Sequence, residues 1–146
     1  MAELTASLIS IATLGVKLTT TLYEFGSTAS SARDQTDRIA RHVSYYGDVL
    51  GLLAERIGDD EPIHSNKALV LVGDLCDHSY DLFEKIKDLL PSPKYHRDQL
   101  SFIQKIAWNF KKPKVDLLVG EIEYLKSTVN LLVTVLFAGK RIRSTR

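Results

Sequence analysis

The sequence predicts an all-α protein, an antiparallel helical bundle of four to five helices, and three observations lead to this fold class. Apolar residues recur at alternating steps of three and four in five segments, which is the repeat of one helix face. No segment alternates between apolar and polar residues with a period of two, as a half-buried strand would. Long helices joined by short connections pack as antiparallel bundles.

Length and composition are those of one globular domain. The chain has 146 residues, 45% of them hydrophobic and 25% charged, and these values exclude intrinsic disorder. A domain of this size buries about two-thirds of its surface and needs no disulfide or metal to support a core. The lone cysteine, Cys76, excludes a disulfide framework and a cysteine-rich zinc module, and it fits a reducing cytosol.

The first predicted helix covers residues 3–25, and Lys17 carries the only charge between its first and last turns. Gly26 is expected to end it, because glycine is the usual residue after a helix C-terminus. Its apolar residues form two rows. The main row is Leu4, Leu8, Ile11, Gly15, Leu18, Leu22 and Phe25, and a second row, expected to widen the apolar face, is Ile9, Val16 and Tyr23.

The second helix is predicted over 31–57 and the third over 62–90. A hydroxyl of Ser30 or Ser31 is expected to cap the second helix, and Pro91 stands at the end of the third. Their apolar faces are Ile39, Val43, Tyr46, Leu50, Leu53 and Ile57, and then Leu69, Val72, Leu75, Cys76, Leu82, Phe83, Ile86 and Leu90.

The fourth helix is predicted over 97–110 and the fifth over 113–138, with Pro113 in its first turn. Gly139 is expected to end the fifth helix, so that residues 1–139 form the bundle and 140–146 a basic tail. The inward residues are Leu100, Ile103, Ile106, Ala107 and Phe110, and then Val115, Leu118, Ile122, Leu125, Val129, Leu132 and Leu136.

Charge is distributed unevenly although the net charge is only +1. Residues 1–90 carry 8 basic and 14 acidic side chains, whereas residues 91–146 carry 11 and 4. Such an uneven distribution of charge says more about the binding partners of a protein than about its fold. Two clusters stand out. The acidic stripe is Asp74, Asp77, Asp81, Glu84 and Asp88, and the basic cluster is Lys105, Lys111, Lys112 and Lys114 around Trp108 and Phe110.

Each cluster has two interpretations. The acidic stripe is either a solvated outer face or a docking surface for a basic face of another copy. In the basic cluster, Trp108 and Phe110 either plug the end of the bundle beside solvated lysines, or they form a contact for single-stranded nucleic acid or lipid headgroups. The near-neutral charge of the chain disfavours nucleic acid.

The sequence contains no pattern typical of an active site. It has no glycine-rich phosphate-binding loop, and its four histidines are scattered without the spacing of metal ligands. Cys76 falls on an apolar helix face and is expected to be a core residue. We therefore expect no enzyme activity, no cofactor, no metal, no small-molecule substrate and no nucleic acid.

The N-terminal segment is neither a typical signal peptide nor a typical membrane span. The flank Met1-Ala2-Glu3 lacks the basic residues that precede the apolar part of a signal peptide. Its serines and threonines make the stretch too weakly hydrophobic for a constitutive transmembrane helix. The sequence favours a helix that is soluble when packed and enters a bilayer when released.

The chain resembles fungal HeLo-like N-terminal domains of STAND/NLR-type proteins, which are related to the HeLo domain of HET-S. The resemblance covers nearly the whole chain. Its carriers are MAELTASLISIA at residues 1–12 with LYEF at 22–25, IAWNFKKPKV at 106–115, and EIEYLKSTVNLL at 121–132.

The resemblance implies a cell-death effector of fungal heterokaryon incompatibility and innate immunity. Family members precede a nucleotide-binding oligomerisation module or an amyloid-forming tail, so we expect the chain to continue beyond Arg146. On activation the bundle is expected to leave the cytoplasm, form homo-oligomers, contact anionic lipids and permeabilise the plasma membrane. The residues expected to insert are Leu4, Leu8, Ile9, Ile11, Leu14, Gly15, Val16, Leu18 and Leu22, with Glu3 near the polar mouth.

A second hypothesis belongs to another class of protein. It is a soluble adaptor bundle that homo-oligomerises through its acidic and basic faces and forms no pore. In that case the first helix contributes only to the stability of the bundle, and the acidic stripe and the basic cluster carry the function.

Overall fold

The computed structural model describes residues 2–58, 66–91 and 99–144, and these residues contain helices and no strand, which confirms the predicted fold class. The first helix is joined to the second through a short 3-10 turn, η1. The elements are α1 (Ala2–Thr28), η1 (Ser30–Ala32), α2 (Arg33–Gly58), α3 (Asn66–Asp88), α4 (Gln99–Asn109) and α5 (Lys112–Ser144).

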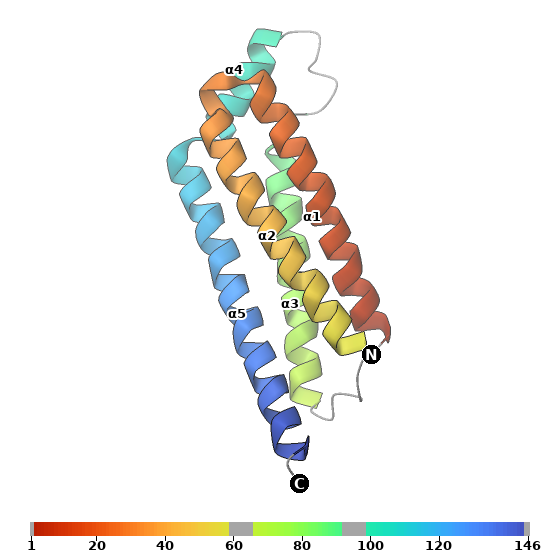
Figure 1. Cartoon of the computed structure of the whole chain (residues 1–146). Coiled ribbons are helices and arrows are strands. Elements are labelled where there is room, and N and C mark those ends of the chain that lie inside the picture. The colour runs from red at the N-terminus through yellow and green to blue at the C-terminus, as the bar shows by residue number, and fades with distance from the viewer. Residues whose placement is uncertain (1, 59–65, 92–98, 145–146) are drawn as a thin grey trace.

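Four long helices form the corners of an elongated bundle (Figure 1). Helix α1 packs against α2 and α3, and α5 packs against the same two helices from the opposite corner. Successive long helices alternate in direction, so that α1 runs parallel to α3 and α2 runs parallel to α5 (Figure 1). The short α4 lies at the end where α1 turns into α2, whereas both chain termini lie at the other end (Figure 1).

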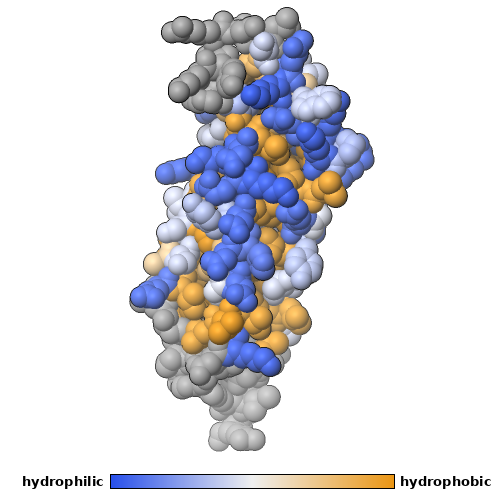
Figure 2. Space-filling model, turned by 180° about the vertical axis from the view of Figure 1, so that it is seen from behind, coloured by the Kyte–Doolittle hydropathy of each residue, from blue (hydrophilic) through white to orange (hydrophobic). Residues whose placement is uncertain are grey.

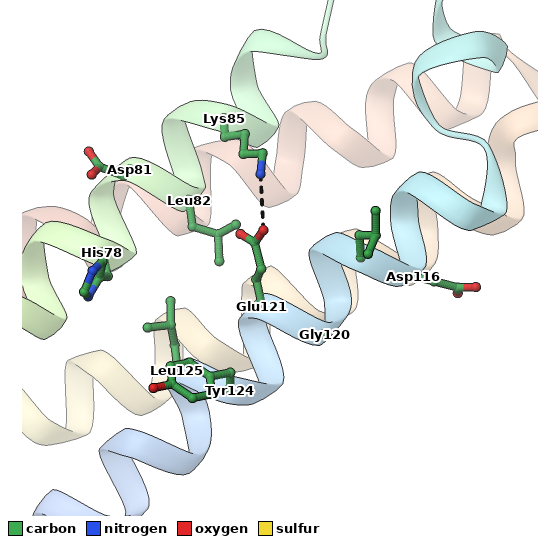
Figure 3. Close-up of a pocket in the computed structure, with 10 residues that line it drawn as sticks. His78, Asp81, Leu82, Lys85, Asp116, Gly120, Glu121, Tyr124 and Leu125 are labelled. Carbon is green, nitrogen blue, oxygen red and sulfur yellow. Dashed lines mark hydrogen bonds and ion pairs between the residues drawn. The ribbon is translucent and has the colours of Figure 1, made fainter.

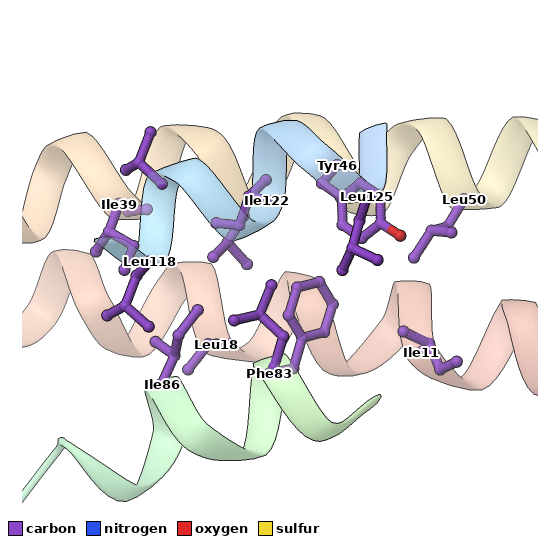
Figure 4. Packing of buried hydrophobic residues seen from close by; sticks show 14 of the residues in the cluster. Ile11, Leu18, Ile39, Tyr46, Leu50, Phe83, Ile86, Leu118, Ile122 and Leu125 are labelled. Atoms are coloured by element: carbon purple, nitrogen blue, oxygen red, sulfur yellow. The ribbon is translucent and has the colours of Figure 1, made fainter. Parts of the chain in front are cut away.

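The main apolar rows predicted from the sequence form most of the core, although Leu69 and Ala107 are only half-buried (Figure 4). In α5 the row is buried from Val115 to Leu132, whereas Leu100 and Leu136 lie outside the described side chains. Cys76 is buried, as expected. The sequence did not point to Phe102, which is buried and stacks on Phe25 with ring centroids 5.2 Å apart.

Glycines allow α1 to approach the backbone of α2 closely. A Cβ atom on Gly15 would lie 3.7 Å from Cα of Gly47 and only 3.1 Å from the ring of Phe83. A Cβ atom on Gly26 would lie within 2.4 Å of the Thr36 hydroxyl oxygen. That hydroxyl is fixed, because it donates to the Ala32 carbonyl oxygen at 3.0 Å.

The structure corrects two predicted helix ends. Helix α1 continues through Gly26 to Thr28, and α5 continues through Gly139 to Ser144, and no glycine in the described part of the chain adopts a positive φ. A glycine inside a helix costs only about 1 kcal/mol relative to alanine, which is too little to end either helix. The tail predicted as a separate segment is therefore helical as far as Ser144, and residues 145–146 lie outside the described residues.

The other boundary predictions concern the serine cap of the second helix and the starts of the third and fourth helices. The predicted serine cap is wrong, because Ser30 and Ser31 lie inside the 3-10 turn η1 and the chain enters α2 directly from that turn at Arg33. The backbone N–H of Ala29 donates to the Phe25 carbonyl oxygen at 3.1 Å, which continues the bonding pattern of α1 into this turn. The predicted helix starts at 62 and 97 lie outside the described residues.

A buried hydrogen bond joins α2 to α3 across the centre of the bundle. The oxygens of Tyr46 and Ser79 are 2.6 Å apart, and Ser79 donates its own proton to the Leu75 carbonyl oxygen at 2.7 Å. Tyr46 is therefore the donor of the central bond. Its ring also meets Phe83 edge to face at 6.0 Å, and burial raises the pKa of Tyr46 to about 12.

The glycine contacts predict opposite effects of alanine at two positions. Gly26→Ala places a methyl group against Thr36 and is expected to lower the free energy of unfolding by about 1–3 kcal/mol. Gly51→Ala meets no atom within 4 Å and is expected to raise it by about 0.5–1 kcal/mol. Urea unfolding measures both, and equal effects would contradict the close approach at Gly26.

The raised pKa of Tyr46 predicts a loss of stability at high pH. Because the unfolded tyrosine ionises near pH 10 and the folded one near 12, the stabilisation is complete below pH 10 and is lost as the pH rises toward 12. The loss amounts to roughly 2–3 kcal/mol at pH 12. Urea unfolding between pH 9 and 11.5 is expected to show a steeper decline for the native chain than for Tyr46→Phe.

Candidate membrane and partner surfaces

Helix α1 buries only one of its two apolar rows. Leu8, Ile11, Gly15, Leu18 and Leu22 are buried, and Leu4 and Leu14 are half-buried against the core. The second row does not widen the buried face, because the long helices that α1 packs against in the described part of the chain are α2 and α3, and the row faces away from both. The exposed fractions are 52% for Ile9, 62% for Val16 and 42% for Tyr23.

Within the described residues, α1 is also the helix whose length and composition would allow it to cross a membrane. The stretch runs from Glu3 to Thr28, and only 22% of its most apolar window is buried inside the bundle. Core helices of soluble proteins meet the same criteria, and α1 is such a core helix in this structure. Its apolar surface nevertheless exceeds what the bundle covers.

Most of the threonine hydroxyls of α1 are satisfied by the helix itself. Four of them donate to the carbonyl oxygen four residues earlier, at 2.7 to 3.1 Å: Thr13, Thr19, Thr20 and Thr21. A hydroxyl that already has an acceptor loses less when it leaves water. Helix α1 is therefore less polar in effect than its composition indicates.

Polar contacts between the long helices connect α2, α3 and α5. Arg38 pairs with Asp116, His42 Nδ1 lies 3.2 Å from Glu123 Oε1, and Lys85 pairs with Glu121 at 3.2 Å. Hydrogen bonds from Arg38, and then from Lys112, hold the pKa of Asp116 below its ordinary value. The charged residues of α1, namely Glu3, Lys17 and Glu24, form no ion pair with any described residue.

The basic cluster lies where α4 meets α5. The Trp108 ring is 61% exposed, with the Nζ atoms of Lys111 and Lys114 at 4.0 and 5.5 Å from its centroid. Phe110 is buried, so only one of the two aromatic residues plugs the bundle. Lys105 and Lys112 are also exposed, and Lys112 pairs with Asp116 at 3.0 Å.

The acidic stripe follows the outer side of α3. Asp74, Asp77, Asp81 and Asp88 are exposed and Glu84 is half-buried, and none of the five pairs with a described cation. Figure 2 shows this face of the molecule, where a band of polar side chains runs along its length between apolar groups. The sequence-predicted acidic and basic residues thus lie on separate surfaces, and Glu3 is exposed at the opposite end from α4.

An open groove of about 670 Å³ lies between α3 and α5 (Figure 3). The Lys85–Glu121 pair bridges it, and Asp81 stands on its α3 side. Leu117 and Tyr124 line the groove although they are 72% and 73% exposed. Sequence analysis missed both residues, because with Leu131 they recur every seven residues in the same way as the buried row of α5.

Groups suited to metal or thiol chemistry are not assembled in the described part of the chain. No set of three or more His, Cys, Asp or Glu residues there could hold a metal ion. Burial, followed by the charge of Asp77, raises the pKa of the Cys76 thiol. A thiol held protonated inside a core is a poor nucleophile.

Comparison with family models, with curated proteins and with solved structures found no match for this chain. The fold and surfaces described above therefore stand on this structure alone. The resemblance to HeLo-like domains remains a prediction from the sequence.

Proposed function

We propose that this domain is a membrane-permeabilising cell-death effector of the HeLo-like kind, resting in the cytoplasm and acting at the plasma membrane. When copies cluster, α1 leaves the bundle and enters the bilayer. The observation that carries the proposal is that α1 has more apolar surface than the bundle covers, while no ion pair to a described residue holds it in place.

The free energy that α1 loses when it leaves the bundle is similar in size to the free energy that it gains when it enters a bilayer. Burial of Leu8, Ile11, Leu18 and Leu22 holds the helix with roughly 6–12 kcal/mol, at about 1.5–3 kcal/mol for each side chain. A bilayer gives the same four residues an apolar environment again. It also covers the second row, Ile9, Val16 and Tyr23, which the bundle leaves in water.

Lys17 explains why clustering is required. A lysine at the centre of a bilayer costs about 2.5–3.5 kcal/mol, so a single copy of α1 inserts poorly. Several copies held at one membrane patch insert with a high effective concentration. The small residues Ala6, Ala12 and Gly15 let inserted helices approach one another closely.

Two aspartates on the exposed row of α1 test the proposal without unfolding the bundle. Ile9→Asp with Val16→Asp is expected to leave the folded domain intact, because both side chains face water. In a bilayer each aspartate costs up to about 3 kcal/mol, so leakage should fall at least tenfold. The measurement is dye release from anionic liposomes by the domain clustered through an added C-terminal oligomerisation tag.

The matched control carries the same substitutions on helices that stay in the bundle. Leu52 on α2 and Leu131 on α5 are also exposed apolar residues, with exposed fractions of 61% and 66%. Leu52→Asp with Leu131→Asp is expected to leave leakage unchanged. Equal leakage from the α1 variant and this control would contradict the insertion of α1.

The second candidate function is the soluble adaptor, favoured by the exposed acidic stripe without ion pairs to described residues. For an adaptor, Asp77→Lys with Asp81→Lys would abolish self-association in sedimentation velocity, whereas the α1 variant would associate normally. Liposome leakage would then be absent from every variant, the native chain included.

A further inference from the structure

One exposed cluster combines positive charge with an exposed aromatic ring, and an anionic membrane surface binds both. We propose that Trp108, Lys111 and Lys114 form a docking site for anionic phospholipid headgroups, an inference that rests on the proposed function of the domain at membranes. The indole is 61% exposed, and both ammonium groups lie over its face, at 4.0 and 5.5 Å from the centroid. A phosphate bound by either lysine is thereby brought next to the indole.

The positive charges of Lys111 and Lys114 are available to bind a phosphate. Asp116 accepts hydrogen bonds from Arg38 and Lys112, so this carboxylate is already neutralised. Lys111 and Lys114 form no ion pair with a described residue. A basic group near an anionic leaflet is attracted to it, and an amphipathic indole prefers the headgroup layer.

A lipid surface fits this site better than the acidic stripe of a second copy. The carboxylates of Asp77 and Asp81 would match the lysines in charge. They offer no apolar contact for the exposed indole, whereas the headgroup layer supplies both phosphates and the edge of the hydrocarbon.

The location of the site gives the docked domain a definite orientation. The cluster lies at the end of the bundle where α1 turns into α2 (Figure 1). At that end Phe25 of α1 stacks on Phe102 of α4, whereas the N-terminus of α1 lies at the opposite end. Docking therefore brings the C-terminal end of α1 and η1 to the headgroup layer, and α1 pivots there when its N-terminal end is released.

Tryptophan fluorescence tests the site directly, because Trp108 is the only tryptophan of the chain. The untagged domain is titrated with phosphatidylcholine vesicles that either contain or lack phosphatidylserine. We expect a blue shift of the emission with the anionic vesicles only, and its reversal as the salt concentration is raised. Lys111→Ala with Lys114→Ala is expected to weaken the partition about 25-fold, at about fivefold for each lysine.

A control of equal charge change separates the site from net charge. Lys67→Ala with Lys85→Ala removes two lysines outside the cluster and is expected to alter the partition less than twofold. No blue shift with anionic vesicles, or equal weakening by both double variants, would overturn the proposal. A shift that appears without vesicles as the protein concentration rises, and is lost in Asp77→Lys with Asp81→Lys, would also overturn it and assign the cluster to a second copy.

This test is independent of pore formation. The Ile9→Asp, Val16→Asp variant keeps the docking site, so it should give the full blue shift, while its tag-clustered form releases at least tenfold less dye than the clustered native domain. Docking without leakage by the native chain would refute the proposed function and leave the lipid site intact. Leakage without a blue shift would refute the lipid site at Trp108 and leave the proposed function intact.

Discussion

The close seating of α1 on α2 is the constraint on which the rest of the molecule depends. Gly15 and Gly47 bring the two backbones together, and Gly26 fits against Thr36 at the other end of the contact. Helix α1 is held close to α2 and packs against no long helix other than α2 and α3 in the described part of the chain, so one row of its side chains faces the core and the adjacent row stays in water. The exposed row is a consequence of the packing geometry rather than a defect of the core.

The other three long helices form a platform with a different kind of connection. A central Tyr46–Ser79 hydrogen bond links α2 to α3, and polar contacts at the surface link α5 to both. Helix α1 adds apolar burial to this platform without sharing its ion pairs. A helix held mainly by non-directional apolar contacts can exchange one apolar environment for another, which is the physical basis of the proposed insertion.

Much of this structure could be predicted from periodicity. The rows led by Leu8 in α1 and Val115 in α5 are buried as expected, because apolar spacing and helix geometry are both local properties. The pattern could not decide that Ile9 and Val16 remain exposed, since that depends on how many helices surround α1. Glycine also failed as a terminator at Gly26 and Gly139, where packing or helix continuity outweighs a small intrinsic cost.

The candidate sites were also predictable only in part from the sequence. The sequence identified the basic cluster, but only the structure shows Trp108 exposed under two lysines while Phe110 is buried. The groove between α3 and α5 was not predictable, because residues from distant segments form it and no local pattern distinguishes Leu117 from a core leucine. Sequence patterns specify which residues share a helix face, and tertiary packing specifies what that face meets.

The most direct test of the release of α1 is a reversible covalent lock. A Cβ atom on Gly58 would lie 3.6 Å from Cγ2 of Thr5, so cysteines at these two positions are within reach of a disulfide, while the native Cys76 is buried. The oxidised Thr5→Cys, Gly58→Cys domain is expected to release no dye from anionic liposomes, and reduction should restore leakage to the native rate. Equal leakage before and after reduction would show that α1 does not need to leave the bundle, and it would contradict the account.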